Sequence, residues 1–221
     1  MRLVYDNVGH TLCFGKGYVN ELVVEHRRLF FDMVNHAILQ ADGGRGSFVL
    51  SIANKPVEFG KYTDIVLQFA PFQLNRKSLL TKLYGALEQK ALGAEAYMET
   101  TELLSDIEGY MNRLAEDFAF DIACKKVAIG PVIRALAPEI DEVEQSPLEK
   151  IFTYMELVRE LDRDRLFIMV HMRSYFSDAD MEQFVESVNL HDFKVLLLES
   201  SSFPVLKNTK RFTIDEDLCE F

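Results

Sequence analysis

Apolar residues recur at three- and four-residue spacings along several stretches of the chain, the pattern of an amphipathic helix with one buried face. We predict such helices at residues 21–40, 76–92, 96–125 and 147–161, a short one at 132–136 and another after Ser177. Asn20 and Asn75 precede two of these stretches and can accept hydrogen bonds from the first turn. Residues 146–149 (SPLE) form a capping box with proline at the first helical position.

Short apolar and β-branched runs between these helices predict strands. Residues 166–170 and 195–198 are apolar without interruption, which is typical of strands covered on both faces. The helix after Ser177 separates them, so they form a βαβ unit and should run parallel. Further strands are predicted at residues 3–5, 11–14, 48–52 and 65–69, the first two joined by a turn at residues 6–9.

The predicted strands lie in the N- and C-terminal thirds of the chain, whereas the middle third is helical. The two terminal thirds should therefore share one mainly parallel sheet, which places the fold in the α/β class. We expect an α/β unit made of residues 1–74 and 146–221, with a helical unit of residues 75–145 inserted in it. Residues 137–145, which are acidic and include Pro138, are the best candidate for a linker.

The composition is that of a folded, soluble protein. Of the 221 residues, 48% are hydrophobic, which is enough to build a core. No apolar run approaches the ~18–20 residues that span a bilayer. Asp6, Asn7 and His10 interrupt the region where a signal peptide would be apolar, and three scattered cysteines form no CxxC pair. We therefore expect a cytoplasmic protein that has neither a disulfide framework nor a zinc knuckle.

The net charge of −11 argues against a protein that coats nucleic acid with a general positive field. The charges are nevertheless segregated along the chain. Four cations and one acid lie between residues 71 and 91, eight acids and one cation between 95 and 121, and three unopposed cations between 122 and 134. Such blocks are either solvated helix faces or local surfaces of opposite sign, and the charge pattern alone leaves both interpretations open.

A phosphate-binding loop is the first site to test, because a predicted strand leads into a helix between residues 65 and 92. The loop motif is GxxxxGK[ST]. Here Lys77 and Ser78 are in register, but Pro71 and Arg76 replace the two glycines. Glycines let backbone amides close on phosphate oxygens, and proline has no amide hydrogen. We therefore expect no working nucleotide site at this junction.

Other catalytic sets are also incomplete. Residues 171–173 (HMR) follow the strand at 166–170, so no carboxylate stands where a nucleotide-hydrolysing protein would hold magnesium. The five histidines lack any metal-binding spacing, and nothing in the sequence assembles Cys124, His171 and Ser51 into a nucleophilic site. These gaps argue against an NTPase and against a hydrolase.

One group of carboxylates could bind a metal. Glu116, Asp117 and Asp121 lie close together in the predicted helix 96–125, with the two aspartates four residues apart on one face. Carboxylates this close either face water or hold a cation, and oxygen ligands of this kind suit calcium. The sequence leaves both possibilities open.

Three pieces of the sequence together resemble a known family. They are residues 72–80 (FQLNRKSLL), residues 147–152 (PLEKIF), and the strand at 166–170 leading to residues 195–199 (VLLLE). In this order they resemble the accessory adaptation protein of type II-A CRISPR systems, the Csn-two family. The similarity extends over most of the chain and is weakest in the N-terminal forty residues.

The resemblance implies an α/β head like a degenerate P-loop domain that has lost nucleotide binding, with a helical leg inserted in it. It implies a homotetrameric ring whose positively charged central hole takes double-stranded DNA ends, with bound calcium shaping the ring. Members act in spacer acquisition together with the CRISPR integrase proteins and the effector nuclease, and have no enzymatic activity of their own. We therefore expect a non-enzymatic ring protein that binds DNA independently of sequence, with calcium as the candidate cofactor and no nucleotide.

A ring would reconcile DNA binding with a negative net charge, because it repeats each basic cluster fourfold around one cavity while acids face outward. The candidates for its lining are Arg76, Lys77, Lys82, Lys125, Lys126 and Lys150. One feature departs from the family. Its members tend to run several acids together after the long leg helix, where this chain has Asp117 and Asp121 and then two lysines. This departure weakens the case for calcium.

Two alternatives remain open from the sequence. The first is a residual nucleotide-binding switch or ATPase that uses Lys77 and Ser78. The second is a protein-binding scaffold whose basic blocks make no contact with DNA.

Overall fold

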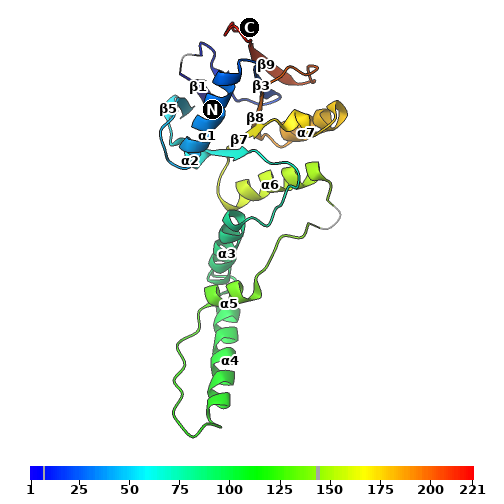
Figure 1. Ribbon diagram of the computed structural model, residues 1–221. Coiled ribbons are helices and arrows are strands. Elements are labelled where there is room, and N and C mark those ends of the chain that lie inside the picture. The colour runs from blue at the N-terminus through cyan, green and yellow to red at the C-terminus, as the bar shows by residue number, and fades with distance from the viewer. Residues whose placement is uncertain (7, 143–144) are drawn as a thin grey trace. The chain divides into compact units, whose positions relative to one another are not determined.

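The computed structural model describes residues 1–6, 8–142 and 145–221 (Figure 1). Packing divides the chain into two units, one made of Met1–Phe72 and Glu144–Phe221 and the other of Gln73–Val143. We call the first the α/β unit and the second the helical unit. Parts of the predicted turn at residues 6–9 and of the predicted linker at 137–145 lie outside the described residues. In the part of the chain that is described, no helix has the length and apolar character needed to cross a membrane.

The larger sheet of the α/β unit is entirely parallel. Its strands follow the order β6 (Thr63–Val66), β7 (Leu166–Val170), β8 (Lys194–Glu199), β3 (Val19–Val24) and β9 (Thr209–Ile214). Every neighbouring pair is parallel. The predicted βαβ unit is confirmed, because β7 and β8 pair and helix α7 (Asp178–Leu190) joins them. The N- and C-terminal parts of the chain share this sheet, as the α/β interpretation requires.

A second, antiparallel sheet lies in the same unit. It contains β2 (Leu12–Cys13), β1 (Arg2–Tyr5), β4 (Phe48–Ile52) and β5 (Lys55–Pro56) in that order. The predicted pairing of the first two strands is confirmed. Apolar side chains of this sheet join those of β3, β7, β8 and helix α1 (Arg27–Ala41) in one hydrophobic core. The short helix α2 (Phe59–Tyr62) adds Phe59 to this core.

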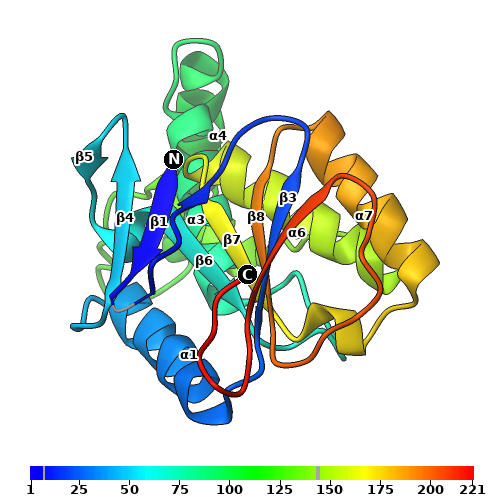
Figure 2. The same cartoon turned by 90° about the horizontal axis from the view of Figure 1, so that it is seen from above.

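Helices cover both faces of the parallel sheet. Figure 2 shows α1 on one side of it and α6 (Pro147–Leu161) and α7 on the other. The predicted capping box at residues 146–149 is confirmed, since Glu149 N–H donates to Ser146 Oγ at 3.3 Å and Ser146 N–H donates to Glu149 Oε2 at 2.6 Å. A second box joins Ser177 and Asp180 at the start of α7. These caps fix where the two helices begin on the sheet.

The prediction of one helix over residues 21–40 was wrong at its start. Residues 19–24 form strand β3, and the helix begins only at Arg27. All six residues of β3 are buried between β8 and β9, a position that only a central strand can occupy. Asn20 donates its side-chain N–H to Cys13 O at 3.0 Å and does not cap a helix. His26 is the cap, accepting the Leu29 N–H at Nδ1 over 3.1 Å.

The helical unit contains α3 (Lys77–Ala91), α4 (Tyr97–Ala115) and α5 (Ile129–Leu136). The predicted helix over 96–125 was therefore too long by one turn or more, because α4 ends at Ala115. The chain must reverse after α4 so that α5 can pack on α3. On its return Val127 N–H donates to Glu108 Oε1 of α4 at 2.9 Å, which anchors the returning segment.

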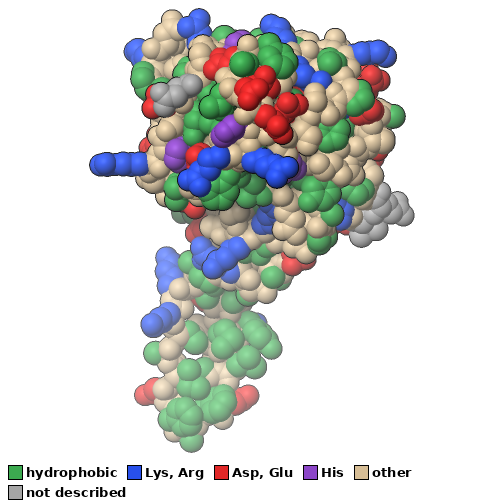
Figure 3. All heavy atoms as spheres, turned by 45° about the horizontal axis from the view of Figure 1, so that its top comes forward, with side chains coloured by type: hydrophobic (Ala, Val, Ile, Leu, Met, Phe, Trp, Pro, Cys, Tyr) green, Lys and Arg blue, Asp and Glu red, His purple; other side chains and the backbone are tan. Residues whose placement is uncertain are grey.

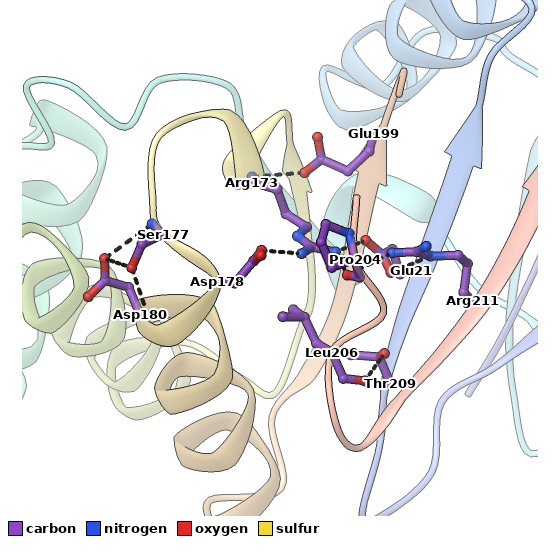
Figure 4. A network of polar contacts seen from close by, with 10 residues as sticks. All are labelled: Glu21, Arg173, Ser177, Asp178, Asp180, Glu199, Pro204, Leu206, Thr209 and Arg211. Atoms are coloured by element: carbon purple, nitrogen blue, oxygen red, sulfur yellow. Dashed lines mark hydrogen bonds and ion pairs between the residues drawn. The ribbon is translucent and has the colours of Figure 1, made fainter. Parts of the chain in front are cut away.

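Buried charges connect the elements on the α7 side of the parallel sheet (Figure 4). Arg173 lies in the 3-10 turn η1 (Met172–Ser174), directly after β7, and its side chain is 1% exposed. Its guanidinium donates to Glu21 of β3 at 2.8 Å and to Asp178 of α7 at 2.7 Å. Glu21, fully buried, also accepts from Arg211 of β9 at 2.8 Å. These buried charges therefore join η1 and α7 to strands β3 and β9, which lie far from them or from each other in sequence.

We expect Arg173→Met to lower the free energy of unfolding by about 3–5 kcal/mol, because it leaves the Glu21 carboxylate buried beside only one cation. The matched control is Arg163→Met, which removes a pair with Asp162 whose arginine side chain is 44% exposed. That change should cost far less, because a solvent-exposed ion pair contributes little to stability. Urea denaturation followed by circular dichroism measures both. Equal losses for the two variants would show that the buried contacts contribute no more than a surface pair.

Candidate functional site

Five of the six candidate DNA-binding residues lie in the helical unit. Arg76, Lys77 and Lys82 lie at or near the start of α3, within two turns of one another. Lys125 and Lys126 are both exposed and lie in the segment that returns from α4. The structure thus places the first three on one helix end and the next two on one extended segment. The sixth candidate, Lys150, lies in the first turns of α6 in the α/β unit.

The surroundings of these cations differ. Arg76 donates its Nε–H to Gln73 O at 3.0 Å, so part of its guanidinium is held by its own loop. Lys77 is exposed. Lys126 lines a hollow of about 440 Å3 between α3 and α4, together with Glu88 and Glu108. The two carboxylates in this hollow compete with phosphate for Lys126, whereas Lys125 does not line the hollow.

The loop that precedes α3 binds an internal carboxylate where a phosphate loop would bind a nucleotide. Glu142 Oε1 accepts hydrogen bonds from Leu74 N–H at 2.8 Å, Asn75 N–H at 3.1 Å and Asn75 Nδ2 at 3.2 Å. Asn75 also accepts the Ile140 N–H at Oδ1 over 2.8 Å. The prediction that Asn75 caps α3 was wrong, because its side chain ties the segment entering the helical unit to the segment leaving it. The Leu74 and Asn75 amides of this loop are thus already hydrogen-bonded to protein.

Strand order identifies a second place where phosphate chemistry could have been expected. Ligands of open parallel sheets bind outside the carboxyl ends of the strands. The loop before α3 follows β6, which is an edge strand, whereas β3 is an interior strand followed directly by α1. Only Glu25 and His26 separate β3 from α1. Two residues are too few for a phosphate-binding loop, and the likeness of the head to a P-loop domain stays a prediction.

The carboxyl edge of the parallel sheet instead holds a buried acid that the sequence interpretation missed. Glu199, the last residue of β8, is 0% exposed. Its Oε1 accepts the Arg173 N–H at 3.0 Å, and its Oε2 makes no hydrogen bond within the described residues. The nearest basic side chain is His171, with Nδ1 at 3.8 Å from Oε2. A glutamate that closes the apolar run of residues 195–198 was the available sequence signal.

Burial controls the protonation of this pair. The pKa of Glu199 is raised to about 7, mainly because burial removes solvent from the carboxylate; the hydrogen bond from the Arg173 amide opposes the shift and the nearby Glu21 carboxylate adds to it. Burial also lowers the pKa of His171, whose ring packs on Phe30 of α1 with centroids 4.7 Å apart. Both effects favour the neutral forms of these two side chains relative to their solvated counterparts.

The proposed metal ligands do not share a helix. Glu116 follows the last residue of α4, and Asp117 and Asp121 lie beyond it, so the helical stacking on which we chose them was wrong. In the part of the chain described here, no group of three or more histidine, cysteine or acidic side chains is arranged to hold a metal ion. Calcium binding stays a prediction.

These features define a class of protein: an α/β fold with a parallel sheet, an inserted helical unit, and protein groups where a nucleotide loop would bind phosphate. The family model described as CRISPR-associated protein (Cas_Csn2) matches residues 40–218, and the chain belongs to this family. A protein of Enterococcus faecalis named CRISPR-associated protein Csn2 is 23% identical over 167 residues, which cover 74% of this chain and 72% of that protein.

A solved structure supports the fold. The one titled "Crystal structure of Stu0660 of Streptococcus thermophilus" superposes with a TM-score of 0.57 at 12% sequence identity. The alignment covers 91% of this chain and 69% of that chain. At this identity the similarity shows the fold alone, and it confirms the α/β class inferred from the sequence.

The raised pKa of Glu199 gives a prediction about pH. The folded protein keeps the Glu199 proton up to about pH 7, whereas the unfolded chain releases it near its ordinary value of 4.5. Between these values the folded state binds more protons, so raising the pH should destabilise it. Compared with Glu199→Gln, which cannot titrate, the wild type should lose about 3 kcal/mol of unfolding free energy from pH 4.5 to 7.5.

Urea denaturation across this pH range measures the difference. Because both proteins keep His171, its opposite contribution cancels to first order in the comparison. Glu160→Gln, which removes an exposed carboxylate from α6, is the matched control. The prediction would be contradicted if the unfolding free energy of the wild type, relative to that of Glu199→Gln, stayed constant or grew as the pH rises.

Proposed function

We propose that this chain is a non-enzymatic protein of CRISPR spacer acquisition that binds double-stranded DNA, with a preference for its ends, independently of sequence. The observation that carries the proposal is the family match over residues 40–218. The saturated amides of Leu74 and Asn75, and the two-residue connection from β3 to α1, support a function without nucleotide.

Phosphate contacts would supply the affinity for DNA. The exposed Lys77 and Lys125 and the neighbouring cations Arg76 and Lys82 are suited to such contacts, which carry no sequence information and weaken with salt. Each chain offers only these few candidate cations to DNA, whereas its net charge is −11. Several copies arranged around one duplex would be needed to overcome the repulsion between DNA and the acidic remainder.

We propose a homotetrameric ring as that arrangement. The helical unit supports self-association, because many of its large hydrophobic side chains face solvent; on the face drawn in Figure 3, hydrophobic atoms gather over this unit. Five of them are between 42% and 55% exposed: Leu103, Tyr110, Met111, Leu114 and Phe118. Exposed apolar surface of this kind marks a protein interface. Calcium, the CRISPR integrase proteins and the effector nuclease are further proposed partners.

We expect the wild type to bind linear duplexes more tightly than closed circular DNA of the same sequence, because a ring must thread over a free end. Lys125→Glu with Lys126→Glu should weaken binding about tenfold or more on every sequence and flatten its dependence on salt. Gel shifts at several salt concentrations measure both effects. Lys55→Glu with Lys207→Glu, both exposed in the α/β unit, is the matched charge control. Equal losses in the two double variants would show that net charge, and not this segment, determines affinity.

The ring gives a separate prediction about mass. Light scattering should return four times the 25.4 kDa of one chain when calcium is present. Removing calcium with EGTA should lower that mass if the ion shapes the ring. A tetramer that resists EGTA would contradict the calcium proposal and leave the ring intact, whereas a monomer under both conditions would contradict the ring.

A further inference from the structure

A groove of about 330 Å3 runs between α6 and α7 of the α/β unit. Phe152 and Phe184 give it an apolar floor, and Leu148, Thr153 and Gln183 belong to its walls. A pocket of this size with an apolar lining and few polar groups is typical of a binding site for a small group or a side chain. The family match and the proposed DNA binding assign no role to this groove.

Two carboxylates line the groove and are held in place by the capping boxes. Glu149 uses Oε2 to accept the Ser146 N–H at 2.6 Å, and Asp180 uses Oδ2 to accept from Ser177 N–H at 3.1 Å and Ser177 Oγ at 2.7 Å. Within the described residues, Glu149 Oε1 and Asp180 Oδ1 have no hydrogen-bond partner. The backbone hydrogen bond from Ser146 lowers the pKa of Glu149, so this carboxylate is ionised at neutral pH. Each acid thus presents one fixed, available oxygen.

No lysine, arginine or histidine is among the described residues that line the groove. Among the described residues that line the groove, none carries a positive charge that would neutralise these two carboxylates. Phosphate would be repelled from such a site, so the groove does not extend a DNA surface. An apolar floor beneath two preset carboxylates matches a side chain that has an apolar stem and a cationic head.

We propose that this groove binds an arginine or lysine side chain presented by a partner protein. The stem of that side chain packs on Phe152 and Phe184, and its cationic head reaches the free oxygens of Glu149 and Asp180. Placement of both acids by capping boxes reduces the conformational entropy lost on binding. The proposal goes beyond DNA binding and does not depend on it, because the groove has the opposite charge.

The test uses two small probes that differ in charge and hardly in shape, N-acetyl-arginine amide and N-acetyl-citrulline amide. Saturation-transfer difference NMR on the full chain measures both dissociation constants. We expect the arginine probe to bind at least about fivefold more tightly than the citrulline probe. This difference in affinity is what one partly exposed ion pair contributes. Equal affinities would overturn the proposal.

Variants locate the contact. Glu149→Gln with Asp180→Asn removes both charges while keeping oxygens that can accept the capping hydrogen bonds, and should weaken the arginine probe about fivefold or more. Glu156→Gln with Glu186→Gln, on the same two helices but outside the groove, is the matched control and should leave binding unchanged. Gln183→Arg introduces a cation at the groove and leaves both capping boxes intact. Its guanidinium should compete with the arginine probe for the carboxylates and so weaken binding of the probe. Unchanged binding in both groove variants would overturn the proposal.

Two further measurements separate other outcomes. Thermal melting by circular dichroism confirms that the variants are folded. Light scattering on Glu149→Gln with Asp180→Asn tests whether the groove binds a second copy of this chain. If the double variant no longer assembles, the occupant is another copy, and the assignment to a different protein is overturned. DNA gel shifts on the same variants should be unchanged, so a failure of the groove proposal is distinguishable from a failure of DNA binding.

Discussion

The burial of Arg173 against Glu21 is the interaction on which the α/β unit depends most. Taking both charges out of water costs several kcal/mol per ion, and the structure recovers that cost only because each group has several partners. The guanidinium meets Glu21 at 2.8 Å and Asp178 at 2.7 Å, and it also donates to Pro204 O at 2.8 Å. Displacing β3 by one residue would turn Glu21 to the other face of the sheet and remove the buried carboxylate partner of Arg173. The ion pair therefore specifies register in a sheet whose other contacts are largely apolar.

This network also occupies polar groups at the carboxyl edge of the parallel sheet, where ligands of such sheets bind. Arg173, directly after β7, donates its two terminal nitrogens to Glu21, Asp178 and Pro204 O, and Glu199 receives the Arg173 amide. Next to α3, Glu142 occupies the loop amides in the same way. At both places protein carboxylates and cations satisfy one another. The groups that could have met a phosphate thus stabilise the fold, which leaves the outer surfaces to carry function.

Local signals in the sequence predicted the parts of the fold that local forces decide. The capping box at Ser146 and the apolar run that became β7 are decided by neighbouring residues, and both are confirmed. Strand β3 was mistaken for helix because Leu22, Val23 and His26 repeat at helical spacing and Glu21 looks like an exposed residue. Its charge is tolerated in the core only through Arg173 and Arg211, which follow it by 152 and 190 positions. No local pattern could reveal that pairing.

The candidate sites were harder to predict, since they depend on which charges meet in space. Sequence blocks placed Lys126 in a basic segment, yet the fold lines the same hollow with Glu88 and Glu108. The capping acids Glu149 and Asp180 were identified as helix-start signals, and only the packing of α6 beside α7 turns them toward a shared groove. Charge blocks along the chain therefore do not translate directly into charged surfaces of the fold. The basic residues near α3 and the acidic oxygens between α6 and α7 carry opposite charge, so the ligands proposed for these two places, phosphate and a cationic side chain, differ in charge as well.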